Sequence, residues 1–311
     1  MENYPELNRL FYGMSPHNYL RMRLRSLYLW LGNSKGMNDL IRSGVLFDEM
    51  AISQTEVPDA EDEQEQQRSA MIECEVLLHH TAETLMRLYL IHSRVPPCPW
   101  LELSRERDFK KFKREVENLR TRLESGDEED RIHQVFHINA DLERVSLNPT
   151  PDKERWDRAA ENLSRFLNFY ASYFLDSAAY NAAKHGLAVT AGEQGIEFGV
   201  GTGEEPILSR KGPAIEYLKV APGPGGHPRW QREIKWITTK RAIPLIYLGC
   251  NFIEAIWNIG AGRYGIRDPT ELQLFDHPPF EEIIARSEVT QPGLEGVVMD
   301  RMSEVLLYRE D

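Results

Sequence analysis

The period of the hydrophobic residues changes sharply at Gly186. Before this glycine, apolar residues recur every three to four positions, which is typical of amphipathic helices. Between residues 187 and 240 they alternate with polar or small residues, and frequent glycines indicate short antiparallel strands. The helical period then returns from Ile243 to Gly260. The sequence therefore predicts a mainly α protein, a helical bundle with a small antiparallel β-sheet inserted between two long helices.

Helix boundary signals divide the rest of the chain. Ser15-Pro16 and Thr150-Pro151 each offer a capping hydroxyl followed by a proline at the first helical position. Gly32 and Gly186 are natural helix ends. The expected helices cover residues 15–31, 39–50, 64–94, 104–123, 131–145 and 151–185. We expect an N-terminal helical region (1–57), a bundle (68–262) with the β insertion at 187–240, and a C-terminal extension (263–311) with one or two short helices.

Two of these helices carry specific packing predictions. The helix at 15–31 is expected to expose three arginines, Arg21, Arg23 and Arg25, and to bury Tyr19, Leu20, Leu24, Leu27, Tyr28 and Leu31. The helix at 151–185 has an aromatic stripe larger than one helical neighbour needs, formed by Phe166, Tyr170, Tyr173 and Phe174. We therefore expect a homodimer with this second helix near the interface.

Charge and cysteine content exclude several broad roles. The net charge of −12 disfavours general coating of nucleic acid or of anionic membranes, although a local basic site remains compatible with it. Three cysteines without a C-x-x-C pair predict neither a zinc site nor a disulfide framework, and so a reducing, cytoplasmic setting. We expect no signal peptide, no metal and no cofactor. The most apolar stretch carries Asn251 and Glu254, which favours a buried helix over a membrane span.

The turn from Tyr180 to Gly186 is the strongest local candidate for chemistry. Asn181 and His185 are four residues apart and share a helix face, and Lys184 joins that side. The negative end of the helix dipole favours protonated His185, whereas the neighbouring lysine opposes it. A histidine balanced in this way can titrate near neutrality, as acid–base catalysis requires. The alternative is that the two cations simply complement the helix end.

This turn resembles the motif of the HEPN (higher eukaryotes and prokaryotes nucleotide-binding) superfamily, in which an arginine and a polar residue precede a histidine. Asn181 and His185 match, but Tyr180 stands where the family has arginine. The stretch Ala82-Glu83-Thr84-Leu85-Met86-Arg87 is similar to the family's earlier helix. The resemblance implies a metal-independent ribonuclease acting across a homodimer, with His185 as acid or base, Asn181 orienting, and Lys184 stabilising phosphate charge. It equally implies a non-catalytic module, because such HEPN members exist.

The helix at 68–94 carries Glu75, His79, Glu83 and Arg87 at four-residue steps. A carboxylate and a histidine at this spacing could bind a metal or relay a proton, but one helix supplies too few ligands for a closed site. Carboxylate–arginine pairs four apart are also ordinary surface stabilisers of helices. In the functional interpretation, Glu83 and Arg87 support the turn, and Arg87 replaces the missing motif arginine.

The β insertion is locally basic, with eight lysines and arginines against two glutamates between residues 206 and 241. Basic residues interleaved with aromatics suit single-stranded nucleic acid, through phosphate attraction and base stacking. The candidate contacts are Arg229, Trp230, Arg232, Lys235 and Trp236. The alternative is that the tryptophans pack against the bundle while the charges keep the sheet soluble.

Two function classes remain open. In the first, the chain is a HEPN-like intracellular protein that contacts RNA or nucleotide and acts as a metal-independent ribonuclease. In the second, it is a non-enzymatic module for dimerisation or for binding a protein partner. Neither class involves a membrane.

Overall fold

The computed structural model describes residues 3–32, 36, 39, 45–47, 50–52, 60–136, 153–184, 188–198, 208–222, 228–237, 239–267, 280, 282 and 301–305. The predicted class is confirmed, because the chain is mainly helical and carries one small antiparallel sheet of four strands. The helices are α1 (Tyr4–Tyr12), α2 (Pro16–Gly32), α4 (Ala60–His92), α5 (Pro99–Arg105), α6 (Phe109–Ser125), α7 (Glu129–Phe136), α8 (Lys153–Leu175), α9 (Ala178–Ala183) and α10 (Thr239–Arg263). The strands are β1 (Val45–Phe47), β2 (Met50–Ile52), β3 (Val189–Phe198), β4 (Leu208–Pro222), β5 (Pro228–Trp236) and β6 (Arg301–Val305).

Several helix predictions need correction. Within the helix expected at 39–50, β1 and β2 form an antiparallel pair, because short apolar triplets fit a strand as well as a helix turn. The helix expected at 104–123 is two helices, since Asp108 caps a new one by accepting from the backbone of Lys110 and Lys111. The helix expected at 151–185 is broken at Asp176-Ser177, residues whose side chains favour helix ends. Most of the stretch expected to complete the helix at 131–145 lies outside the described residues.

The chain forms two compact units that interleave along the sequence. Unit 1 contains residues 1–21, 79–177 and 245–285, and unit 2 contains residues 22–78, 178–244 and 286–311. Each unit is described by itself below. The linear division into three regions expected from the sequence stays a prediction.

Unit 1 has an aromatic core. Phe166 and Tyr170 of α8 contact Phe252 of α10, and Phe174 contacts Phe112 of α6. Gly249 of α10 leaves room for this packing, because a Cβ there would lie 2.4 Å from Cγ2 of Thr81. Three members of the predicted dimer stripe are therefore buried inside the unit, and the aromatic residues of α8 no longer argue for an interface.

The α10 helix provides the apolar stretch noted in the sequence. Arg241–Arg263 is long and apolar enough to cross a membrane by length and composition, and 56% of its most apolar window is buried inside the structure. A core helix of a globular protein passes the same test.

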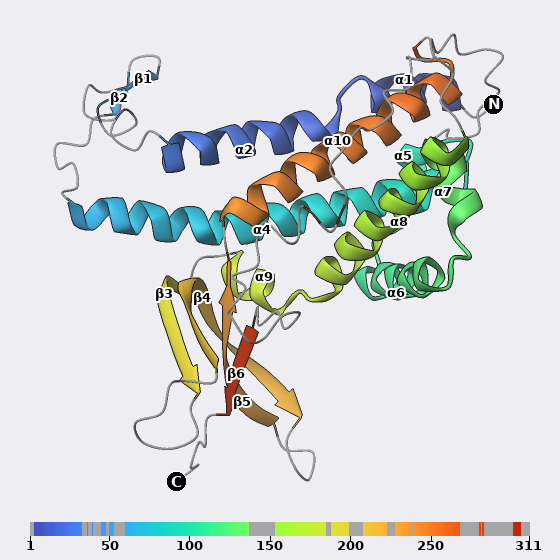
Figure 1. Ribbon diagram of the computed structural model, residues 1–311. Coiled ribbons are helices and arrows are strands. Elements are labelled where there is room, and N and C mark those ends of the chain that lie inside the picture. Colours follow the sequence, from blue (N-terminus) through green and yellow to red (C-terminus); the bar gives the residue numbers. More distant parts are fainter. Residues whose placement is uncertain are drawn as a thin grey trace. The chain divides into compact units, whose positions relative to one another are not determined.

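Unit 2 contains the sheet, whose strand order is β3-β4-β5-β6 with every pair antiparallel (Figure 1). Three strands come from the predicted insertion. The fourth, β6, comes from the C-terminal extension, where only short helices were expected, and pairs with β5 so that Ile234 lies opposite Met302. The tail thus covers an edge of the sheet that would otherwise have unpaired backbone groups.

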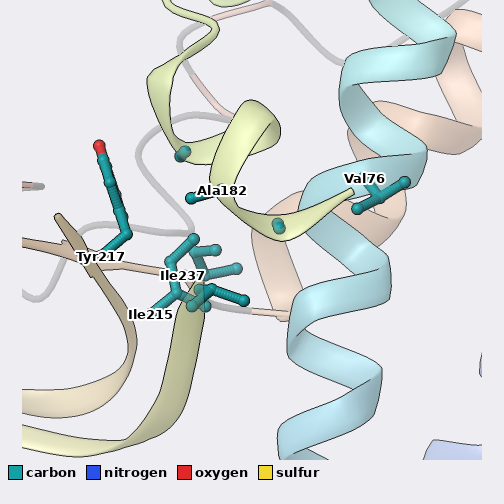
Figure 2. Close-up of a cluster of buried hydrophobic side chains, with 8 residues drawn as sticks. Val76, Ala182, Ile215, Tyr217 and Ile237 are labelled. Carbon is teal, nitrogen blue, oxygen red and sulfur yellow. The ribbon is translucent and has the colours of Figure 1, made fainter. Parts of the chain in front are cut away.

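One face of the sheet packs on helices of the same unit (Figure 2). Ile215 and Tyr217 of β4, together with Ile237, form a buried cluster with Val76 of α4 and the alanines of α9. Small side chains at Ala179, Ala182 and Ala183 let this short helix approach the sheet closely, which explains why α9 is held despite its six residues.

A buried histidine makes the stability of unit 1 depend on pH. His92 donates from Nδ1 to the carbonyl oxygen of Leu88 (2.8 Å), so Nε2 accepts from the hydroxyl of Tyr12 (2.8 Å). Burial lowers the pKa of His92 to about 4. Between the unfolded pKa near 6.5 and the folded pKa, the unfolded chain binds a proton that the folded chain does not.

We therefore expect the free energy of unfolding to fall by up to about 3 kcal/mol as the pH drops from 7 to 4, with full stability above pH 6.5. Denaturant unfolding at several pH values measures it. His92→Gln should lose this part of the pH dependence, whereas Tyr12→Phe, which keeps the buried imidazole, should retain it. Equal pH dependence in wild type and His92→Gln would contradict the account.

Candidate functional site

The turn singled out in the sequence is partly described. Asn181 and Lys184 are exposed on and just after α9, whereas His185 and Gly186 lie outside the described residues. The backbone N–H of Lys184 donates to the carbonyl oxygen of Tyr180 (2.8 Å), and its ammonium lies 6.0 Å from the centre of the Tyr180 ring. The structure thus places Tyr180, Asn181 and Lys184 at one helix end, and the catalytic role of His185 stays a prediction.

Glu83 and Arg87, which were predicted to support the turn, pair with each other within unit 1. Arg87 donates to Glu83 (Nε–Oε1 2.9 Å), and its guanidinium lies 4.0 Å from the centre of the Phe112 ring. Both contacts are typical of a helix-surface pair that also packs on an aromatic ring. Glu83 and Arg87 belong to unit 1, whereas Asn181 and Lys184 belong to unit 2. Substitution of Arg87 for the motif arginine therefore stays a prediction.

The other two residues of the four-residue series have different partners. The ring of His79 lies beside that of Phe174 in unit 1, with ring centres 5.5 Å apart, and Glu75 binds Lys235 of the sheet in unit 2. Among the residues that the structure describes, no group of three or more histidines, cysteines or carboxylates could hold a metal ion.

The predicted nucleic-acid contacts are divided between the two faces of the sheet. Side chains alternate along β5, so Arg229 and Lys235 lie on one face and Trp230, Arg232 and Trp236 on the other. Lys235 and Trp236 are buried, and the indole of Trp236 donates to the carbonyl oxygen of Gln194 (3.3 Å). Trp230 is exposed and Arg229 half-buried. Of the five candidates, Arg229 and Trp230 keep access to solvent, and neither binds a carboxylate among the residues that the structure describes.

Arg232 is bound by carboxylates on the neighbouring strands. It donates to Glu216 of β4 through Nε and Nη2 (both 2.8 Å) and lies 3.4 Å from Glu304 of β6. Hydrogen bonding to Glu216 raises the pKa of Arg232. Glu216 therefore occupies the paired N–H donors that Arg232 would otherwise use to bind a phosphate.

A second carboxylate, Glu233, is completely buried on the inner face. It accepts from the hydroxyl of Tyr217 (2.5 Å), from the ammonium of Lys219 and from the hydroxyl of Ser303 (3.0 Å). Burial by itself would raise the pKa of Glu233, but these hydrogen bonds and Arg301 outweigh it and leave the pKa below its usual value. The basic residues of the sheet thus serve largely to neutralise carboxylates of the same unit.

The most deeply buried ion pair of the unit joins the sheet to α4. Lys235 Nζ lies 2.7 Å from Glu75 Oε1, and the two side chains are 8% and 1% exposed. Two charges removed from water need each other, because either one alone would carry an uncompensated desolvation penalty.

A different feature dominates the surface of α2. Leu20, Leu24 and Leu27 are buried as predicted, but Tyr19 and Tyr28 are exposed, which corrects the expected core face. Arg21 and Arg23, expected in solvent, are ion-paired with Glu254 and Glu73 respectively. Outside its buried leucines, α2 exposes Met22 and Leu29 on the opposite side and Tyr19 and Trp30 on the adjoining flank. We call these four residues the outward stripe.

Comparison of the chain with protein-family models, with curated proteins and with solved structures finds no match. Function therefore has to be argued from the geometry alone. Sequence reasoning missed the outward stripe because it assigned Tyr19 to the core face and gave Met22, Leu29 and Trp30 no role. The available signal was that 16–32 is apolar on two sides, which is more than one buried face requires.

The pair Lys235–Glu75 can be tested by a double-mutant cycle. Glu75→Leu should lower the free energy of unfolding by about 3–5 kcal/mol, because it removes the carboxylate that binds a buried ammonium. Adding Lys235→Met should recover much of that loss. Urea unfolding at pH 7 measures both. Glu124→Gln, which breaks an exposed pair with Arg120, serves as control and should cost at most about 1 kcal/mol. A double variant no more stable than Glu75→Leu would refute the pairing.

Proposed function

We propose that the chain is a non-enzymatic dimerisation module in which the outward stripe of α2 packs against the same stripe of a second copy. The observation that carries this proposal is an apolar surface on the solvent side of a helix that is already apolar on its buried side. Tyr19, Met22, Leu29 and Trp30 are 59%, 58%, 49% and 39% exposed. Monomeric proteins expose such residues singly, and a gathered set is typical of an interaction surface.

The helical period places the four side chains of the outward stripe on one side of α2. Because α2 is uninterrupted from Pro16 to Gly32, residues 19, 22, 29 and 30 lie within about 100° around its axis, and the centre of this arc is about 140° from the buried leucines. Ser26 lies in the middle of the outward stripe and is exposed. A small side chain there lets another helix approach closely, with larger residues on either side.

The order of residues along the outward stripe favours a second copy as the occupant. From the N-terminal end the order is Tyr19, then Met22, then the region of Arg25 and Ser26. From the C-terminal end it is Trp30, then Leu29, then the same region, so both directions give an aromatic residue followed by an aliphatic one. A twofold axis near this centre would place Tyr19 by the partner's Trp30 and Met22 by the partner's Leu29. Such self-complementarity is what an isologous interface requires. The helix has no carboxylate, and Arg21 and Arg23 are already paired with Glu254 and Glu73, so Arg25 is the charge that dimerisation would bring near its own copy.

The dimer is tested by sedimentation velocity at micromolar concentration. Wild type should sediment with the mass of two chains. The double variant Met22→Glu/Leu29→Glu should sediment as one chain, because a dimer would bury two new carboxylates from each copy, four in all. The matched control is Leu218→Glu with Val220→Glu, which changes two equally exposed apolar residues on the sheet. A monomeric wild type, or a double variant at α2 that stays dimeric, would overturn the proposal.

A second proposal follows the resemblance to the HEPN superfamily, namely contact with RNA and its metal-independent cleavage at the α9 turn. The exposure of Asn181 and Lys184 at one helix end supports it, because both side chains are accessible to a ligand. A phosphodiester there would meet the amide and the ammonium, and His185 would exchange the proton.

Cleavage of mixed-sequence RNA in the presence of EDTA tests the second proposal. His185→Ala should reduce the rate by about 10²–10⁴ while the far-ultraviolet circular dichroism stays unchanged. Thr190→Ala, an exposed change nearby on β3, should cleave like wild type. Absence of cleavage by wild type, or equal rates for wild type and His185→Ala, would remove the enzymatic proposal without affecting the dimer.

A further inference from the structure

A polar pocket of about 360 Å³ lies in unit 1, between the end of α4, one face of α6 and the start of α7. Three arginines line it, namely Arg94, Arg122 and Arg131. Glu115, Asn118 and Ser93 supply the other polar groups, and Leu90 is the one apolar side chain among the lining residues. Asn118 and Arg122 are four apart on α6, so the helix presents both to the same space.

A buried carboxylate fixes two of the arginines. Glu128 is 1% exposed, and its Oε2 accepts from Nε of Arg122 (2.5 Å) and from Nη1 of Arg131 (3.1 Å). Its Oε1 accepts from the hydroxyl of Tyr89 (3.1 Å), which is itself completely buried. The two guanidinium groups are therefore held in place from behind by a carboxylate that is saturated with donors.

These bonds leave donors of both guanidinium groups uncommitted. Arg122 uses Nε and Arg131 uses Nη1, and the terminal nitrogens of Arg122 and Nη2 of Arg131 have no partner among the residues that the structure describes. The side chains are 32% and 48% exposed, so solvent reaches them. Arg94 differs, because it already binds Glu106 (2.7 Å) and Glu115 (2.6 Å).

We propose that this pocket binds the phosphate group of a small, hydroxyl-rich metabolite such as a sugar phosphate. Planar guanidinium groups bind phosphate oxygens through paired hydrogen bonds, and groups that are already positioned lose little entropy on binding. The remaining oxygen and amide groups of Glu115, Asn118 and Ser93 suit ligand hydroxyls. Among the residues that the structure describes, no aromatic side chain lines the pocket, which disfavours a nucleobase that would need to stack.

Charge balance predicts a modest affinity. Glu106, Glu115 and Glu128 offset the three arginines, so recognition rests on hydrogen-bond geometry rather than on a large positive potential. This inference is independent of the dimer and of the α9 turn, because every residue that it uses belongs to unit 1.

Isothermal titration calorimetry of the full chain tests the pocket with three probes, namely inorganic phosphate, ribose 5-phosphate and ribose. Ribose 5-phosphate should bind more tightly than inorganic phosphate, and ribose should give no measurable heat. Absence of binding by both phosphate probes at millimolar concentration would overturn the proposal. Equal affinity for the two would overturn the assignment of a hydroxyl-rich ligand.

Two variants localise the binding. Arg131→Gln should weaken ribose 5-phosphate by about tenfold or more, because one charge-assisted donor pair is lost. Asn118→Asp changes an exposed residue and places a carboxylate in the pocket, so it should weaken binding at least as much even where Arg131→Gln affects folding. The control Arg120→Gln makes the same change in charge on the opposite face of α6 and should bind like wild type. Affinity unchanged in Asn118→Asp would place the phosphate elsewhere and contradict the proposal.

Discussion

The burial of Lys235 against Glu75 constrains the rest of the sheet unit. Because side chains alternate along a strand, directing Lys235 toward α4 also directs Glu233 inward and sends Arg232, Ile234 and Trp236 to the opposite face. Glu233 then needs donors, which Tyr217, Lys219 and Ser303 provide. Ser303 lies on β6, so the C-terminal strand completes the solvation of a carboxylate that the insertion alone would leave partly unsatisfied.

The sequence predicted the fold class well because long amphipathic helices and the change of period at Gly186 are strong local signals. It missed β6 because strand pairing between residues more than 60 positions apart has no local signature, and it misjudged 45–52 because apolar triplets fit two structures. Alternation along β5 was available in the sequence and would have divided the predicted nucleic-acid residues between two faces. The partner carboxylates were not, because Glu75 lies 160 residues from Lys235 and the pairing of Glu216 with Arg232 depends on the register of two strands.

The described surfaces of the molecule differ in how far their side chains are already bound by neighbouring groups. Lys219, Arg232 and Lys235 of the sheet are paired with carboxylates of the same unit, and RNA binding by the sheet stays a prediction. Arg122 and Arg131 retain donors because one carboxylate serves both. The outward stripe of α2 presents four large side chains that are 39% to 59% exposed, which is why we propose dimerisation rather than catalysis.

Disulfide trapping at Ser26 tests the twofold packing of α2 most directly. The three native cysteines are buried and free, so they give little background. With the axis near the centre of the stripe, Ser26→Cys in two copies would come within the 3.5–4.5 Å Cβ separation that a disulfide needs. Mild oxidation should therefore yield a covalent dimer on a non-reducing gel, whereas Lys184→Cys, exposed beyond α9, should remain monomeric. A Ser26→Cys protein that stays monomeric under oxidation while native in circular dichroism would contradict the account.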